Sequence, residues 1–214
     1  MEQARSNQRQ RRAGQKRELI LDAARAVFEA EGLEGASLRA IAAKAGYTPA
    51  ALYFHFESKE AVYAEVLHRS LTALGARVAE AVAPAGTPEE RLKSAATAFF
   101  EFYAENGRDL DLGFFLFRGG MKPAGLGQAR DERLNDALEV ALRPISDAAT
   151  ELGASSRKAG LVMVDCFAHA TGLLLLLHTG RIRMFGASAP ILMEKYIDRQ
   201  IAALKSPSQT DMLC

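Results

Sequence analysis

The sequence predicts an all-α protein. Apolar residues recur three and four positions apart along most of the 214-residue chain, as on one face of a helix, and the alternation typical of β-strands is nearly absent. Residues that start and stop helices divide this pattern into segments. Because 49% of the residues are hydrophobic, the helices can bury a sizeable interior. We therefore expect a globular helical fold in which short N-terminal helices precede longer ones.

The first two helices are predicted from their boundaries. One spans residues 17–31 and stops before Gly32. The next begins after Ser37, a residue type that caps helix N-termini. It ends at Gly46, because glycine bends the chain there without a steric cost from a Cβ atom. The apolar positions of this second helix have helical spacing: Leu38, Ile41, Ala42 and Ala45.

A third short helix follows after a tight turn. Thr48 is its expected N-cap, and Pro49 occupies the first position, where a missing N–H does no harm. Leu52 and Phe56, four residues apart, mark its buried side. The outward side carries Thr48, Ala50, Tyr53 and His55. Two short helices joined in this way predict a helix-turn-helix, whose second helix fits the major groove of DNA.

Six further helices are expected after the helix-turn-helix. Ser58 is the start signal of the fourth, and the sequence Thr87-Pro88-Glu89-Glu90 is a strong start signal for the fifth. Pro144 should kink or divide the seventh. The expected ranges are 59–82, 87–105, 109–117, 128–152, 156–179 and 189–204. The glycine-rich residues 119–127 predict a loop and lack the spacing of a nucleotide-binding motif.

Positive charge is concentrated at the N-terminus. Residues 1–17 contain six basic residues and one acid, whereas the whole chain has a net charge of only +1. A basic segment next to a helix-turn-helix suits contact with DNA phosphates. Its polar, aperiodic sequence predicts a disordered arm over residues 1–14 when DNA is absent, and a tail kept only for solubility is the alternative.

The sequence favours a reduced, cytoplasmic setting. The two cysteines, Cys166 and Cys214, give no disulfide framework. The N-terminus lacks the apolar segment of a secretory signal. The most apolar run, residues 160–180, is interrupted by Asp165 and His169, so we expect no membrane span.

One stretch resembles a known family closely. Residues 46–60, with the sequence GYTPAALYFHFESKE, are similar to the DNA-binding signature of the TetR family of bacterial regulators. The resemblance covers residues 15 to 65, and Tyr47 stands where the family more often has valine. It implies a DNA-binding domain at 15–60, a ligand-binding and dimerisation domain at 61–205 and a frayed tail at 206–214.

The family resemblance also implies a mode of DNA binding. A dimer places one recognition helix per subunit in successive major grooves of double-stranded DNA, at an inverted-repeat operator. Phosphate contacts are expected from Thr48, Tyr53, His55 and Lys59, with Ser37 and Arg39 touching the backbone from the preceding helix. Base contacts are expected from Thr48, Pro49, Ala50 and Phe54, mostly with thymine methyl groups.

Aromatic residues gather where the family has its ligand cavity. Seven of the sixteen Phe and Tyr residues lie between positions 99 and 117. Such cavities are apolar with a few polar groups, so we expect a small apolar or aromatic effector. The expected ligand-binding residues are His68, Phe99, Tyr103, Phe114, Phe117, Phe167 and His169. An ordinary packed core is the alternative for these aromatic residues.

The last two helices are too apolar for one small domain to cover easily. Residues 173–177 are five leucines, and the final helix carries a wide apolar stripe from Ile191 to Leu204. A four-helix bundle with the same helices of a second copy would bury both surfaces, and the family dimerises in this way. The expected homodimer interface contains Leu173, Leu176, Leu177, Ile191, Tyr196 and Ile197. The alternative buries both helices within one chain.

We expect neither a metal site nor a catalytic site. Asp165, Cys166 and His169 are close in sequence, but no second cluster supplies further metal ligands, and no cofactor is implied. The sequence thus predicts a sequence-specific DNA-binding regulator, most simply a repressor released by its ligand. The alternatives are a constitutive DNA-binding regulator without an effector and, less favoured, a helical enzyme.

Overall fold

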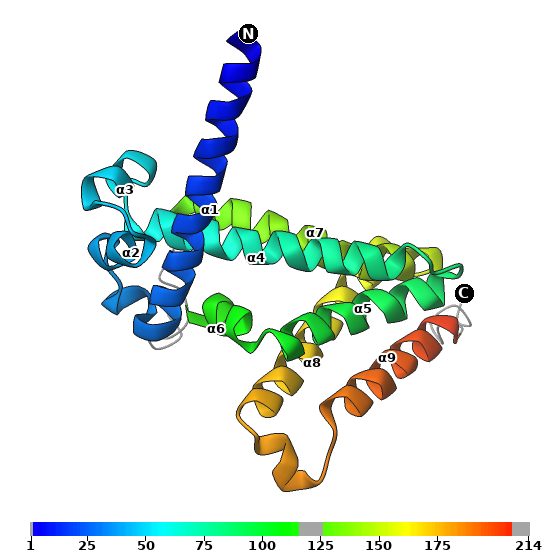
Figure 1. The fold of residues 1–214 in the computed structure, drawn as a ribbon. Coiled ribbons are helices and arrows are strands. Elements are labelled where there is room, and N and C mark those ends of the chain that lie inside the picture. The colour runs from blue at the N-terminus through cyan, green and yellow to red at the C-terminus, as the bar shows by residue number, and fades with distance from the viewer. Residues whose placement is uncertain (1, 116–125, 207–214) are drawn as a thin grey trace. The chain divides into compact units, whose positions relative to one another are not determined.

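The computed structural model describes residues 2–115 and 126–206. These residues form nine α-helices and one 3-10 helix, and they contain no β-strand, which confirms the all-α prediction (Figure 1). The helices are α1 (Glu2–Gly35), α2 (Leu38–Ala45), α3 (Pro49–His55), α4 (Lys59–Val82), α5 (Pro88–Glu105), α6 (Gly107–Phe115), α7 (Gln128–Glu151), α8 (Ser156–His178) and α9 (Ala189–Lys205), with the 3-10 helix η1 (Arg181–Phe185) between the last two. Residues 207–214, most of the expected frayed tail, and the expected loop up to residue 125 lie outside the described residues.

The chain divides into two compact units. The first comprises Met1–Ser70 and Arg108–Leu134, and the second comprises Leu71–Gly107 and Asn135–Cys214. This division differs from the expected boundary at residue 60, because the first turns of α4, most of α6 and the first turns of α7 pack with α1–α3. The helices α4 and α7 each contribute residues to both units.

The first helix is longer than the sequence pattern predicts. It begins at Glu2, so residues 2–14, expected as a disordered arm when DNA is absent, belong to α1 in this structure. The segment is rich in Gln, Arg and Ala, which are good helix formers even where no apolar periodicity is present. The predicted stop at Gly32 is confirmed, since this residue leaves helical geometry with φ 69° and ψ 177°.

The first unit has its own hydrophobic core. Its most deeply buried side chains come from the three helices of the helix-turn-helix and include Ile20, Ile41 and Leu52. Tyr63 of α4 is also buried and meets Phe28 of α1 edge to face, with ring centroids 4.9 Å apart. The Tyr63 hydroxyl donates a hydrogen bond to the backbone carbonyl of Leu112 in α6. The aromatic ring therefore joins α1, α4 and α6 in one core.

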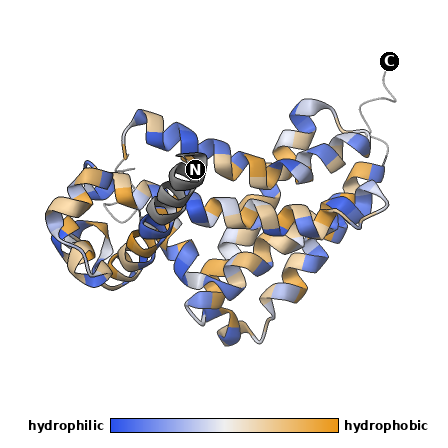
Figure 2. Ribbon diagram, turned by 45° about the horizontal axis from the view of Figure 1, so that its top comes forward, coloured by the Kyte–Doolittle hydropathy of each residue, from blue (hydrophilic) through white to orange (hydrophobic). Residues whose placement is uncertain are grey.

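The second unit is built on α5, α8 and α9. α5 begins with a capping box in which Thr87 Oγ1 accepts from the Glu90 N–H at 3.2 Å and the Glu90 carboxylate accepts from the Thr87 N–H at 3.0 Å. α7 continues unbroken through Pro144, so that proline does not divide the helix. The helices show hydrophobic and hydrophilic residues on different sides, as expected for packed amphipathic helices (Figure 2).

α8 is apolar on two sides. Its inner side buries Cys166, Ala170 and Leu174. Length and composition alone would let this helix cross a membrane, but core helices of globular proteins pass the same test. One apolar side of α8 is therefore buried within the unit.

Candidate nucleic-acid interface

The turn between α2 and α3 depends on one glycine. Ser37 caps α2, with its Oγ accepting a hydrogen bond from the Ala40 N–H at 3.1 Å. Gly46 ends the helix in the left-handed region, at φ 73° and ψ 27°. The next N–H, of Tyr47, then donates to the Ala42 carbonyl at 2.9 Å. A side chain at position 46 would strain this backbone, so glycine sets the angle at which α3 leaves α2.

α3 is held by one face and leaves the other free. Thr48 is the N-cap, and its Oγ1 accepts from the Ala51 N–H at 3.3 Å. Leu52 and Phe56 are buried, as their spacing predicted. Residues of the opposite face are exposed: Thr48, Pro49, Ala50 and Tyr53. His55 is half-buried.

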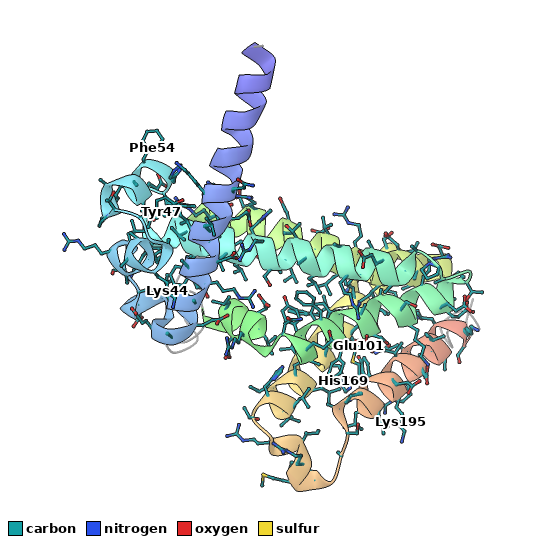
Figure 3. The ribbon with its side chains drawn as sticks, in the orientation of Figure 1. Lys44, Tyr47, Phe54, Glu101, His169 and Lys195 are labelled. Carbon is teal, nitrogen blue, oxygen red and sulfur yellow. The ribbon has the colours of Figure 1, made fainter. Side chains whose placement is uncertain are left out.

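Phe54 is the most exposed large hydrophobic side chain of this helix. It is 87% exposed, against 57% for Tyr53. The ring points away from α2 and α3 (Figure 3), and its edge meets the His55 ring at a centroid distance of 5.6 Å. A phenylalanine this exposed gains nothing for the fold, so its place on α3 suits contact with another molecule.

Lys59 has a structural role that the sequence does not reveal. Its Nζ donates to the backbone carbonyls of Glu34 at 3.0 Å and Ala36 at 3.3 Å. These carbonyls lie at the end of α1 and in the link to α2, so Lys59 joins the start of α4 to that link. Two of its three N–H groups are used within the chain, which leaves one for the expected phosphate contact. Arg39 and Ser37, by contrast, are exposed.

A hollow of about 510 Å³ lies beside the recognition helix within the first unit. Its wall includes Tyr53, His55, His68 and Glu65. Glu65 accepts from Arg133 at 2.6 Å and from Arg17 at 3.1 Å. Burial alone would raise the pKa of Glu65, but the two arginine hydrogen bonds outweigh it and the pKa is lowered. Burial, and then the nearby Arg133, lower the pKa of His68 and favour its neutral form.

The expected ligand-binding residues do not form one group. His68 belongs to the first unit and lines the hollow just described. Phe99 and Tyr103 are buried in the second unit, where Phe99 meets Tyr103 at 5.2 Å and Phe167 at 5.7 Å between ring centroids. Phe99 thus makes edge-to-face contacts with two other aromatic rings, a favourable geometry for packed aromatic side chains.

Two further expected ligand-binding residues, Phe114 and Phe117, belong to the last turn of α6 or follow it in sequence. Phe114 is a residue of α6 and belongs to the first unit, but its side chain lies outside the described part of the chain. Phe117 lies outside the described residues.

His169 carries an unpaired buried nitrogen. Its ring stacks on Tyr196 of α9, with centroids 3.9 Å apart and planes at 12°. Burial chiefly lowers the pKa of His169, which favours the neutral ring. The Nε2 atom is buried and has no hydrogen-bond partner among the described residues. An unpaired buried polar atom costs free energy, so it is a candidate contact for a ligand.

The described residues do not assemble a metal site. No group of three His, Cys, Asp or Glu side chains among them is placed to hold an ion. Cys166, next to Asp165 in sequence, is fully buried, and burial raises the pKa of its thiol to about 12. A thiol with so high a pKa is a poor nucleophile at neutral pH.

The residues expected at the dimer interface differ in exposure. Leu173 and Ile197 are buried within the chain itself. Leu176 and Leu177 are half-buried, as is Tyr196, while Ile191 is exposed.

A different face of α8 is exposed and apolar: Leu161, Val164, Ala168 and Leu175. Their spacing is that of one helical face, a signal already present in the sequence. The run of leucines at 173–177, by contrast, covers every side of the helix and so does not identify one face.

Comparison with known proteins agrees with this arrangement. Residues 20–66 match the family model described as "Bacterial regulatory proteins, tetR family". The chain is 29% identical to the HTH-type transcriptional regulator YobS of Bacillus subtilis over 168 residues, or 78% of each protein. It is 39% identical to the HTH-type transcriptional repressor KstR2 of Mycobacterium tuberculosis over 82 residues, or 38% of this chain and 41% of that protein.

Solved structures show the same fold. The transcriptional regulator FadR of Bacillus subtilis, in complex with stearoyl-CoA, has a TM-score of 0.64 to this chain at 17% identity. The match covers 88% of this chain and 97% of the FadR chain. A protein from Rhodococcus sp. RHA1 has a TM-score of 0.71 to this chain at 21% identity. The match covers 89% of this chain and 96% of that protein.

The matched region contains the glycine turn, the anchoring residues Leu52 and Phe56 and the exposed face of α3. The chain therefore belongs to the TetR family of bacterial regulatory proteins, and it is a DNA-binding transcriptional regulator.

Proposed function

We propose that this regulator is a repressor, that it binds an inverted-repeat operator as a homodimer in the cytoplasm, and that a small apolar or aromatic molecule releases it. The observation that carries the DNA-binding part is the exposed face of α3, with Phe54 at 87% and Tyr53 at 57% exposure. Thr48, Pro49 and Ala50 extend this face to the N-terminus of the helix, where phosphate oxygens are bound favourably.

The homodimer is supported by the exposed apolar face of α8. Leu161, Val164 and Leu175 lie on that face, and Ile191 on α9 is exposed as well. Contiguous exposed apolar residues of this kind mark interaction surfaces. A second copy presenting the same face would cover them in an isologous interface, which is the commonest arrangement of soluble dimers.

The effector is supported by His169. Its buried, unpaired Nε2 lies in the second unit, and Phe167 is two residues away in sequence. A ligand that supplies a hydrogen-bond partner there would remove the cost of that unpaired nitrogen. FadR of Bacillus subtilis, which shares the fold, was solved with stearoyl-CoA, so this fold is able to hold a long apolar chain.

Release from the operator would be a shift between two populations of the dimer. The ligand binds one arrangement more tightly than the other, and it moves the equilibrium only by that difference in affinity. Because α4 and α7 each contribute residues to both units, either helix offers a path for the coupling.

A constitutive regulator is the second candidate. The close packing of Phe99, Tyr103 and Phe167 favours it, since a filled core leaves no room for an effector. Thermal unfolding with stearoyl-CoA and with small aromatic acids separates the two candidates. A ligand-dependent rise in Tm that is lost in His169→Phe supports the effector, whereas an unchanged Tm with every probe supports the constitutive regulator.

The DNA-binding proposal is tested on the DNA upstream of the chain's own gene. Fluorescence anisotropy at several salt concentrations should show tight binding to one inverted repeat, with an affinity that falls steeply as salt rises. Equal affinity for every DNA fragment of that region would contradict the proposal. If stearoyl-CoA or another stabilising probe left operator affinity unchanged at saturation, the release mechanism would be wrong.

A further inference from the structure

The hollow beside the recognition helix is lined by α1, α3, α4 and the start of α7 (Figure 1), all within the first unit. Each helix contributes polar side chains to its wall: Arg17 from α1, Tyr53 and His55 from α3, His68 from α4 and Arg130 from α7. Its volume of about 510 Å³ is in the range of pockets that hold small molecules. An occupant of the hollow would therefore contact the recognition helix directly.

The charged residues of this wall favour an anion. Among the residues that line the hollow, three arginines stand against two glutamates. Glu65 accepts from Arg133 at 2.6 Å and from Arg17 at 3.1 Å, so one carboxylate serves two guanidinium groups. The other glutamate, Glu57, pairs with Arg130. The excess of one guanidinium over the carboxylates attracts a molecule with one negative charge.

Arg130 is held in position but is paired with a carboxylate that a ligand can displace. Its Nη1 donates to the Leu126 carbonyl at 2.9 Å, which orients the guanidinium. Its Nη2 donates to Glu57, whose side chain is 74% exposed. An ion pair this exposed contributes little to stability, because water solvates both charges. A ligand carboxylate can therefore take the place of Glu57 on a guanidinium that is already oriented.

The rest of the wall is apolar. Phe56, Ala64 and Leu134 are buried side chains that line the hollow, and Ala61 and Ala129 extend this surface. A wall with one charged anchor and an apolar remainder suits a molecule with one charged end and an apolar body. A carboxylic acid with an aromatic or aliphatic body has this form, because it carries one negative charge at neutral pH.

We propose that this hollow is a second ligand site, which binds an apolar monocarboxylate through Arg130 and thereby weakens DNA binding. The bound acid shares the hollow with Tyr53 and His55, which are expected to contact DNA phosphates. Its negative charge repels the DNA backbone, so each of the two ligands lowers the affinity for the other. The effect on DNA rests on the proposed operator binding, whereas the binding of the acid does not. His169, where the effector is proposed, belongs to the second unit.

Isothermal titration calorimetry without DNA tests the binding step. The probe is phenylpropionate, and all titrations are made at one ionic strength. Acetate carries the charge without the apolar body, and the amide of the probe carries the body without the charge. Both should bind about tenfold more weakly than phenylpropionate or worse, because each loses one of the two sets of contacts.

Variants of the hollow should change the affinity for the acid in opposite directions. Arg130→Gln should weaken binding by about tenfold, because a hydrogen bond between two charged groups is lost. Glu57→Gln should strengthen binding by about threefold, because the competing carboxylate is gone. The matched control is Arg143→Gln, which removes another arginine of α7 that pairs with a glutamate, Glu139, at 3.2 Å. This control should bind the acid like wild type, and circular dichroism shows whether each variant folds.

Fluorescence anisotropy on the operator tests the effect on DNA. Saturating phenylpropionate should lower operator affinity about tenfold in wild type and in Arg143→Gln. The same concentration should leave the affinity of Arg130→Gln nearly unchanged. Each variant is compared with itself in the presence and absence of the acid, so a direct effect of the substitution on DNA binding cancels.

Four outcomes would overturn the inference. One is equal affinity of wild type, Arg130→Gln and Glu57→Gln for the acid, and another is equal affinity of wild type for acetate and phenylpropionate. The third is binding that is lost in His169→Phe and kept in Arg130→Gln, which would place the acid in the second unit. The fourth is a bound acid that leaves operator affinity unchanged. Failure of the wild-type protein to bind any operator would instead contradict the proposed function, and the calorimetry would still decide whether the hollow binds the acid.

Discussion

Arg25 in α1 and Asp109 in α6, eighty-four residues apart in sequence, form a partly buried ion pair in the first unit. The Arg25 Nη2 and Asp109 Oδ2 atoms are 2.9 Å apart, and Asp109 is only 4% exposed. Arg25 also binds Glu29 at 2.9 Å. The pair holds α6 against α1. Because α6 follows α5 directly in the chain, the segment after α5 is thereby connected to the candidate DNA-binding site.

The Arg25–Asp109 pair should stabilise the first unit. Arg25→Ala leaves the Asp109 carboxylate buried without its partner, and Asp109 Oδ1 already has none among the described residues. We expect a loss of about 2–3 kcal/mol in the free energy of unfolding, measured by urea titration. The double variant Arg25→Ala/Asp109→Asn should recover part of that loss. Equal destabilisation by the single and double variants would show that Arg25 acts through packing alone.

Phe54 should matter for DNA and not for folding. Phe54→Ala should lower operator affinity by about tenfold, or about 1.4 kcal/mol, without changing Tm. Phe185 on η1 is 75% exposed and is a matched control, since Phe185→Ala removes the same exposed surface from the second unit. A similar loss of affinity in both variants would refute a direct role for Phe54.

Gly46 should be required by its backbone angle. Gly46→Ala places a Cβ in a left-handed conformation, at a cost of about 1–2 kcal/mol in unfolding free energy. No atom lies within 4 Å of that Cβ, so steric contact adds nothing. Gly75 within α4 is also free of contacts, and Gly75→Ala should stabilise by about 0.5–1 kcal/mol. Urea titrations of the two variants check this prediction, because the free energy of unfolding should fall in Gly46→Ala and rise in Gly75→Ala.

Glu65 should make stability depend on pH. Its pKa is lowered in the folded state, because the hydrogen bonds from Arg133 and Arg17 outweigh its burial. Its contribution is therefore complete above the ordinary pKa of 4.5 and disappears as pH falls through the lower folded pKa. The urea midpoints of wild type and Glu65→Gln should differ at pH 7 and converge as pH falls below 4.5. Glu80→Gln, at an exposed position, is the control, and a constant gap down to low pH would contradict the prediction.

The apolar face of α8 should hold the dimer. Leu161→Glu together with Leu175→Glu should convert the protein to a monomer in analytical ultracentrifugation, because two charges would be buried at the interface. The control Val140→Glu changes an equally exposed apolar residue on α7 and should leave the mass unchanged. If the variant with both leucines replaced remains a dimer, the interface lies on another surface of the protein.

Local signals in the sequence determined the helices and the helix-turn-helix. Ser37, Gly46, Thr48 and Thr87 act on backbone groups a few residues away, and each caps or ends a helix where its residue type predicts. Helical spacing likewise identified the buried side of α3 at Leu52 and Phe56. These features depend on neighbours in the chain, so residue type and spacing are enough to find them.

Only the tertiary structure decided how the longer helices share their apolar surface. It buries Leu173 and Ile197, expected at the dimer interface, and exposes Leu161 and Val164 instead. It also turns Lys59 toward the carbonyls of Glu34 and Ala36. The physical reason is that an all-round apolar helix has no preferred side until its neighbours are placed, and those neighbours come from distant parts of the chain.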